Sequence, residues 1–125
     1  MKDIESLWFN NPKLNEAEFI ALAYPANHTQ NSWRAVGGKL FITNQRVLFL
    51  PNKIDNSLGG EPVEFYLHDI ETVFLKEGQL SLNELFSGGL VDRLGLRMRD
   101  GQEHLFVVEK VTTKRGELES HLENK

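Results

Sequence analysis

The sequence contains no cysteine in its 125 residues, which excludes disulfide bridges, zinc–thiolate sites and thiol catalysis. It also lacks any apolar run approaching the ~20 residues that a membrane-spanning helix requires. The N-terminal stretch MKDIESLWFNN has no long apolar region of the kind found in secretory signals. We therefore expect a cytoplasmic protein, which is either free or attached to a membrane only at its surface.

Positive charge is also scarce. The 14 lysines and arginines are outnumbered by 18 aspartates and glutamates, and the formal net charge is −4 at pH 7. Nucleic-acid binding usually requires a strong basic face, so we expect no nucleic-acid partner. The same shortage disfavours a general attraction to anionic membranes, although a local basic cluster could still bind an anionic lipid.

Sequence motifs of catalysis and cofactor binding are missing. There is no G-x-S-x-G nucleophile motif, no P-loop and no dinucleotide-binding fingerprint. The four histidines fall in separate predicted elements without ligand-type spacing: His28, His68, His104 and His121. The pair His68-Asp69 suits a packed histidine beside a turn-capping aspartate better than a metal ligand. The sequence thus predicts no enzymatic activity, no metal site and no cofactor.

What the sequence does contain is a succession of short β-type runs separated by turn residues. Strands are predicted at Phe19–Tyr24, Val36–Thr43, Arg46–Leu50, Glu64–Leu67, Thr72–Lys76, Arg93–Arg99 and Gln102–Val108, and a helix at Val111–Leu122. Pro25 is expected to end the first strand, with a polar loop at Asn27–Ser32. These elements predict one domain over 1–125, with an N-terminal helical segment at 1–11 and a core at 16–122. The fold class is mainly β, a bent seven-stranded antiparallel barrel or sandwich capped by a C-terminal α-helix.

The segment LFITNQRVLFLP, residues 40–51, predicts a β-hairpin that is apolar on both faces. A two-residue turn at Asn44-Gln45 places Leu40, Ile42, Val47 and Phe49 on the core face and Phe41, Leu48 and Leu50 on the other. This second face needs a cover. The N-terminal helix could supply it through Ile4, Leu7 and Trp8; the alternative is a protein partner or a second copy of the chain.

The segment RLGLRMRDGQEHLFVV, residues 93–108, predicts a second hairpin around Asp100-Gly101. A type I turn with a glycine bulge aligns Leu94, Leu96 and Met98 with His104 and Phe106 on the inner face. A plain two-residue turn instead places Leu105 and Val107 inside. We favour the bulged turn because it buries Phe106, which has the larger apolar area.

Three stretches in this order resemble the GRAM domain family, which is related to the pleckstrin-homology (PH) fold. They are GKLFITNQRVLF (38–49), FYLHDIETV (65–73) and LRMRDG (96–101), followed by Phe106, and the likeness spans Glu16 to Leu122. The resemblance implies a seven-stranded, strongly bent sheet capped by a C-terminal helix. It also implies a non-catalytic module that associates with membranes or binds proteins. The match does not include the basic first loop of phosphoinositide-binding PH domains, since Arg34 is the only base between Pro25 and Val36.

Two candidate surfaces follow from these patterns. The first is apolar and suits a protein partner or self-association: Phe41, Leu48 and Leu50, with Leu82, Leu85 and Phe86 from the connection at 80–90. That connection could equally be a short helix over one end of the barrel. The second suits an anion or a lipid headgroup: Trp33, Arg34, Arg93, Arg97 and Arg99. An ordinary solvated strand face is the alternative for these arginines. We expect a protein-interaction or self-association module, with peripheral membrane binding as the second hypothesis.

Overall fold

A single antiparallel sheet and a C-terminal helix organise the molecule in the computed structural model, which describes residues 9–31, 34–77 and 92–123. The elements are β1 (Ile20–Asn31), β2 (Arg34–Thr43), β3 (Arg46–Pro51), α2 (Lys53–Ser57), β4 (Val63–Tyr66), η1 (Leu67–Asp69), β5 (Ile70–Lys76), β6 (Arg93–Met98), β7 (Glu103–Val107) and α4 (Val111–Glu123). The strands follow the order β4-β3-β2-β1-β7-β6-β5. The predicted fold class, seven antiparallel strands with a C-terminal helix, is confirmed.

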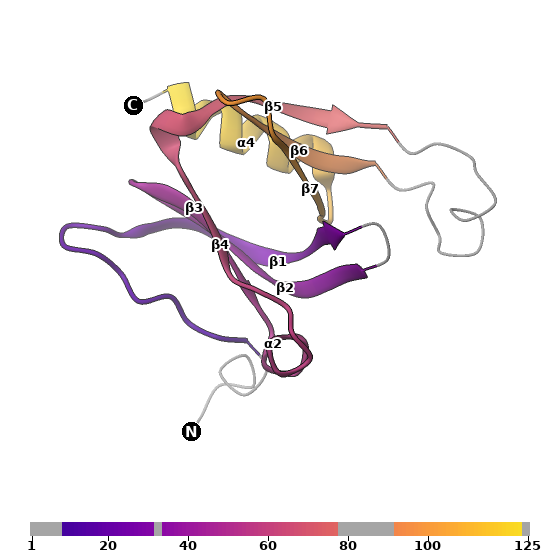
Figure 1. Ribbon diagram of the computed structural model, residues 1–125. Helices are drawn as coiled ribbons and strands as arrows, with labels where there is room; N and C mark the ends of the chain where they lie inside the picture. The colour runs from indigo at the N-terminus through magenta and orange to yellow at the C-terminus, as the bar shows by residue number, and fades with distance from the viewer. Residues whose placement is uncertain (1–8, 32–33, 78–91, 124–125) are drawn as a thin grey trace.

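The helix α4 covers the half of the sheet formed by β5, β6 and β7 (Figure 1). Leu118 is completely buried, and Val111 and Leu122 pack against the core from the same helix. The central core residues come from both halves of the sheet; Leu40, Phe49, Leu96 and Phe106 are fully buried. Burial of this apolar surface supplies most of the free energy that holds the helix on the sheet.

The hairpin of β2 and β3 has the predicted register. Leu40 pairs with Phe49, and Ile42 pairs with Val47. These four side chains belong to the buried core. Because side chains alternate along a strand, this pairing also places Phe41 opposite Leu48 on the other face.

The hairpin of β6 and β7 has the register that we favoured. Leu94 pairs with Phe106, and Leu96 pairs with His104. Gly101 has a φ of 93°, a conformation that glycine adopts without steric cost. The bulged turn is therefore confirmed, and Phe106 is fully buried.

The predicted end of the first strand is wrong. β1 continues through Pro25 and through the expected polar loop to Asn31. Ala26 and His28 are buried, whereas Asn27 between them is exposed, so the polar stretch alternates as a half-buried strand does. Pro25 is tolerated because, among the described strands, β7 pairs with β1 at Asn27 and His28 but not at the proline, where β2 is the neighbour.

The connection between β3 and β4 contains a short helix where a loop was expected. The helix α2 is five residues long and begins after Asn52. The Asn52 side chain accepts a hydrogen bond of 2.8 Å from the backbone N–H of Asp55, a typical N-cap. The predicted connection at 78–92 falls almost entirely outside the described residues.

Candidate functional site

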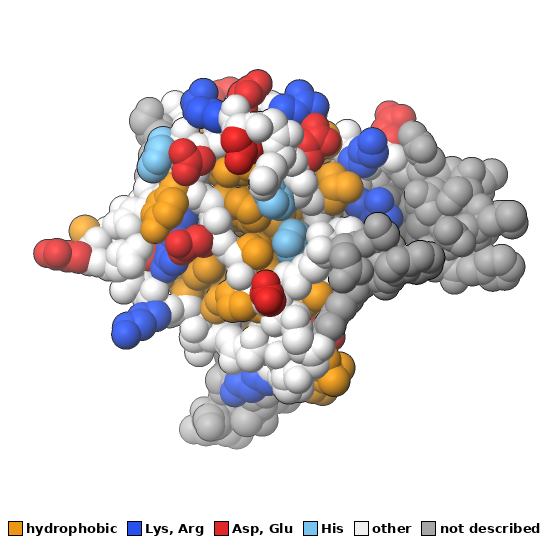
Figure 2. Space-filling model, in the orientation of Figure 1, with side chains coloured by type: hydrophobic (Ala, Val, Ile, Leu, Met, Phe, Trp, Pro, Cys, Tyr) orange, Lys and Arg blue, Asp and Glu red, His pale blue; other side chains and the backbone are white. Residues whose placement is uncertain are grey.

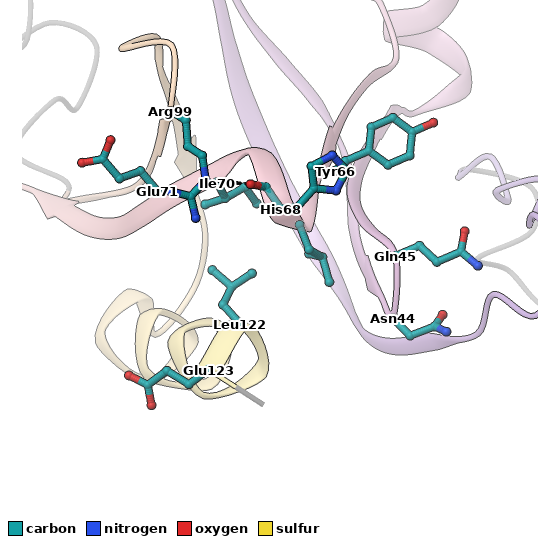
Figure 3. A pocket seen from close by; sticks show the side chains of 10 residues that line it. Asn44, Gln45, Tyr66, His68, Ile70, Glu71, Arg99, Leu122 and Glu123 are labelled. Carbon is teal, nitrogen blue, oxygen red and sulfur yellow. Dashed lines mark hydrogen bonds between the residues drawn. The ribbon is translucent and has the colours of Figure 1, made fainter. Parts of the chain in front are cut away.

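A cavity of about 670 Å³ opens where the β2–β3 turn, η1 and the end of α4 meet (Figure 3). We call it the helix-end pocket. Leu67, Ile70 and Leu122 form its apolar floor, and the first two of these are buried. Its rim is polar and consists of Asn44, Gln45, Tyr66, His68, Glu71, Arg99 and Glu123. The pocket thus combines a place for an apolar side chain with surrounding hydrogen-bonding groups.

Hydrogen bonds between distant segments hold the walls of this pocket. The N–H of Leu67 donates to the Gln45 carbonyl at 3.1 Å, and the N–H of Arg99 donates to the Asp69 carbonyl at 2.9 Å. These two bonds fix both ends of η1. The short η1 turn is therefore set by the β2–β3 turn on one side and by the end of β6 on the other.

The helix is tied to the same turn by His121. Its Nε2 lies 2.7 Å from the carbonyl oxygen of Thr43. A carbonyl only accepts, so Nε2 carries the proton and donates. This bond links the last turn of α4 to the end of β2 and fixes the distance across the mouth of the pocket.

The exposed rim has groups that suit a peptide. Tyr66 and His68 stack with ring centroids 6.0 Å apart, and the side chain of His68 is 80% exposed. Nε of Arg99 donates to the His68 carbonyl at 2.7 Å. The rim can therefore donate to carbonyl groups of a bound segment, while Glu71 and Glu123 can accept from its N–H groups.

The predicted apolar surface is not exposed in this chain. Phe41 is 3% exposed and Leu48 is 6% exposed, and Leu50 is half-buried. The described segment that begins at Phe9 is tied to the end of β3, where Nδ2 of Asn10 donates to the Pro51 carbonyl at 2.9 Å. Phe41 and Leu48 therefore do not offer the surface that a partner would need, because the chain itself covers them.

Several predicted positions lie outside the described residues. These are Trp33, Leu82, Leu85 and Phe86, together with the N-terminal helix that carries Ile4, Leu7 and Trp8. Arg34 begins β2, but its side chain is outside the described part. Phe9 is described: Nζ of Lys39 lies 5.5 Å from its ring centroid and 5.7 Å from that of Phe41.

The arginine row does not form one anion-binding cluster. Arg97 pairs with Glu103, with Nη2 and Oε2 2.8 Å apart, and its guanidinium lies 5.3 Å from the Phe74 ring centroid. Arg93 is half-buried on the same face of β6. Arg99 lies beyond the end of β6 and lines the helix-end pocket instead. The charge of Arg97 is thus largely neutralised, and Arg99 alone lines this pocket.

The described ranges hold neither a metal-binding cluster nor a membrane-spanning helix. No three histidine, aspartate or glutamate side chains of that part come together as metal ligands. None of its helices is long and apolar enough to cross a membrane.

Most pocket residues were not marked by any sequence pattern. Tyr66 and Leu67 looked like ordinary strand residues, and Asn44 and Gln45 like ordinary turn residues. One usable signal was glutamine at the second turn position, an uncommon residue there. Its side chain Nε2 donates to the Glu16 carbonyl at 2.9 Å, which explains why it is used.

Comparisons with known proteins identify the fold. The Vps36 N-terminal PH domain matches with a TM-score of 0.64 and 20% identity over 90% of this chain and 85% of that one. The hSac2 domain from human phosphoinositide phosphatase Sac2 matches with a TM-score of 0.59 and 15% identity over 86% and 70%. The C-terminal domain of an unknown protein from Leishmania infantum has a TM-score of 0.63 and 12% identity, over 84% of each chain. No protein-family model and no curated protein sequence matches this chain. The likenesses show a PH-like fold.

Proposed function

We propose that this PH-like domain is a non-catalytic protein-interaction module of the GRAM type. The helix-end pocket receives an apolar side chain from a peptide segment of a protein partner. The observation that carries the proposal is the pocket itself, a cavity of about 670 Å³ with a buried apolar floor and a polar rim. Binding sites commonly have this size and this combination of linings.

The rim favours a peptide over a free apolar molecule. An extended peptide presents carbonyl and N–H groups on both sides of each side chain. Tyr66, His68 and Arg99 supply donors around the mouth, and Glu71 and Glu123 supply acceptors. A segment with one apolar residue between ordinary backbone groups would therefore satisfy both parts of the pocket.

Peripheral binding to anionic lipid has less support. Such binding needs clustered cations that remain accessible to phosphate. Arg97 is paired with Glu103, and Arg99 shares the rim of the helix-end pocket with the carboxylates of Glu71 and Glu123. We therefore rank a protein segment ahead of a lipid headgroup.

Selection from a displayed library of random peptides on the wild-type chain tests the proposal. Synthetic copies of the enriched peptides are then titrated calorimetrically into wild type, Tyr66→Ala and His68→Ala. Both side chains are exposed, so the fold should survive their truncation. We expect each variant to bind about tenfold more weakly, which corresponds to ~1.4 kcal/mol.

The matched control is Ile54→Ala. It removes an apolar side chain that is 52% exposed on α2, at the end of the molecule away from α4 (Figure 1). Its affinity for the peptides should equal that of wild type. The proposed pocket would be contradicted if no peptide were enriched, or if all three variants lost the same affinity for the enriched peptides.

A further inference from the structure

A second hollow lies along β4, on the face of the molecule seen in Figure 2. Two adjacent cavities, of about 410 and 650 Å³, share Val63 and His104 among their lining residues. One extends toward Gln30 on β1, and the other toward Gln102 in the β6–β7 turn. We call the pair the β4 groove. Figure 2 shows histidine side chains set among hydrophobic ones near the centre of this face.

One wall of the groove is the edge of the sheet. β4 is the last strand in the sheet order, so its outer side pairs with no described strand. Such an edge can accept an extended peptide as an additional strand. Val63 is half-buried, and the ring of Phe65 packs 4.4 Å from that of His104, centroid to centroid. The edge therefore borders an apolar and aromatic floor.

The groove carries an excess of negative charge. Its described lining includes four carboxylates and one guanidinium: Glu61, Glu64, Asp69, Asp100 and Arg99. Glu64 is neutralised by Arg46, whose Nη1 lies 2.6 Å from Oε2. Neither Glu61 nor Asp100 forms an ion pair with a described basic side chain. A positively charged segment would therefore complement this groove, and an acidic one would be repelled.

A buried donor without an acceptor lies at the Gln30 end. His28 is 4% exposed, and its Nε2 has no hydrogen-bond partner in the described part of the chain. The Gln30 amide is fixed, because its Nε2 donates to the Glu61 carbonyl at 2.7 Å and its Oε1 accepts from the Glu61 N–H at 3.0 Å. The other amide hydrogen points to Nδ1 of His28, 3.2 Å away. Nδ1 therefore accepts, and the proton of neutral His28 is on Nε2.

This arrangement distinguishes between ligand types. An Nε2–H group cannot bind a metal ion while it keeps its proton, but it can donate to a carbonyl oxygen. The ring of His104 stands 6.1 Å from that of His28, centroid to centroid. A ligand carbonyl that reached this donor would supply the partner whose absence is costly.

We infer that the β4 groove binds a basic, extended peptide segment of a protein partner, which adds to β4 as a short strand. Lysine or arginine side chains of this segment lie toward Glu61 and Asp100, and its apolar side chains lie over Val63 and His104. The groove adjoins the helix-end pocket, because Arg99 lines both. The inference does not rest on the proposed function, since it is argued from the sheet edge, Glu61, Asp100 and His28.

The probe is a blocked synthetic peptide of alternating lysine and valine, and its control is the same peptide with glutamate in place of lysine. β4 has four residues, so a length of about seven residues spans it with an overhang. The peptide is titrated into the isotopically labelled full chain and followed by NMR. We expect shifts in the amides of Val63, Glu64, Phe65 and His104 and in the ring nitrogens of His28, with the lysine peptide only.

Two variants sharpen the result. Glu61→Arg should weaken binding of the lysine peptide by about fivefold or more. Glu117→Arg, which changes an exposed position on α4, should leave that binding unchanged. His68→Ala should leave the affinity unchanged, which separates this site from the helix-end pocket. The inference is overturned if the shifts avoid β4 or if the glutamate peptide binds as tightly as the lysine peptide. It is also overturned if Glu61→Arg binds the lysine peptide as tightly as wild type does. Amide shifts in β4 that depend on protein concentration without peptide would assign the edge to a second copy and also overturn it.

Discussion

Arg46 and Glu18 form a two-pronged ion pair across 28 positions of sequence, with Nε to Oε2 at 2.8 Å and Nη2 to Oε1 at 3.1 Å. Both residues are buried. The hydroxyl of Thr43 donates to Oε2 of Glu18 at 2.6 Å. The hydrogen bond from Arg46, helped by those from Thr43 and the N–H of Asn15, lowers the pKa of Glu18 to about 2. This pair ties the segment before β1 to the β2–β3 turn.

Replacing Arg46 by alanine should be strongly destabilising. Among the described residues, the Glu18 carboxylate would keep Thr43 and Asn15 as its partners but would lose its counter-charge. An uncompensated buried charge costs about 3–5 kcal/mol. Denaturant-induced unfolding of Arg46→Ala measures the change. Glu64→Gln is the control, because the Glu64 side chain is 42% exposed and its pair with Arg46 should contribute only ~0–1 kcal/mol. An equal decrease in the free energy of unfolding in the two variants would show that the buried Arg46–Glu18 pair contributes no more than the exposed Arg46–Glu64 pair.

Stability should fall as the pH drops through the titration range of His28. Burial, with a smaller effect of nearby His104, lowers the pKa of His28 to about 4 from an ordinary 6.5. The unfolded chain therefore takes up a proton at higher pH than the folded chain does. The resulting stabilisation is complete above pH 6.5 and is lost as the pH falls toward 4, by about 3 kcal/mol.

His28→Phe tests this assignment, since phenylalanine keeps the stacking on Phe106. The free energy of unfolding should fall less between pH 6.5 and 4 in the variant than in wild type. Some drop remains because burial also lowers the pKa of His104. A second decline, from pH 4.5 toward 2 as Glu18 protonates, should persist in both proteins. An unchanged profile between pH 6.5 and 4 would place the titration elsewhere.

The parts of the fold that sequence predicted are those encoded locally. Asn44-Gln45 and Asp100-Gly101 mark their turns, and the alternation beside each turn then assigns every side chain to a face. The extent of β1 was not encoded in this way. His28 is polar and looked like a loop residue, but its burial depends on Phe49 and Phe106 from other strands, which pack on its ring.

The candidate sites were less predictable for a similar reason. The helix-end pocket is made by a turn, a single helical turn and the end of a helix, and only the three-dimensional arrangement brings these together. Arg99 is the one predicted site residue that lines this pocket. Phe41 and Leu48 were placed correctly on the second face of their hairpin. Sequence pattern alone could not show that these two side chains are buried within the chain.

Two glycine substitutions should have opposite effects on stability. A Cβ at Gly38 in β2 would overlap the carbonyl oxygen of Leu50 and lie 2.8 Å from Cα of Pro51. Both contacts are with backbone, so Gly38→Ala should push β3 away from β2 and cost roughly 1–3 kcal/mol. Gly116 lies in α4, where an added methyl group would have nothing within 4 Å, so Gly116→Ala should add ~1 kcal/mol through helix propensity. Thermal unfolding should therefore show a lower midpoint for the first variant and a midpoint raised by about 2–6 °C for the second. A stable Gly38→Ala protein would mean that the two strands can separate locally without loss of the surrounding core.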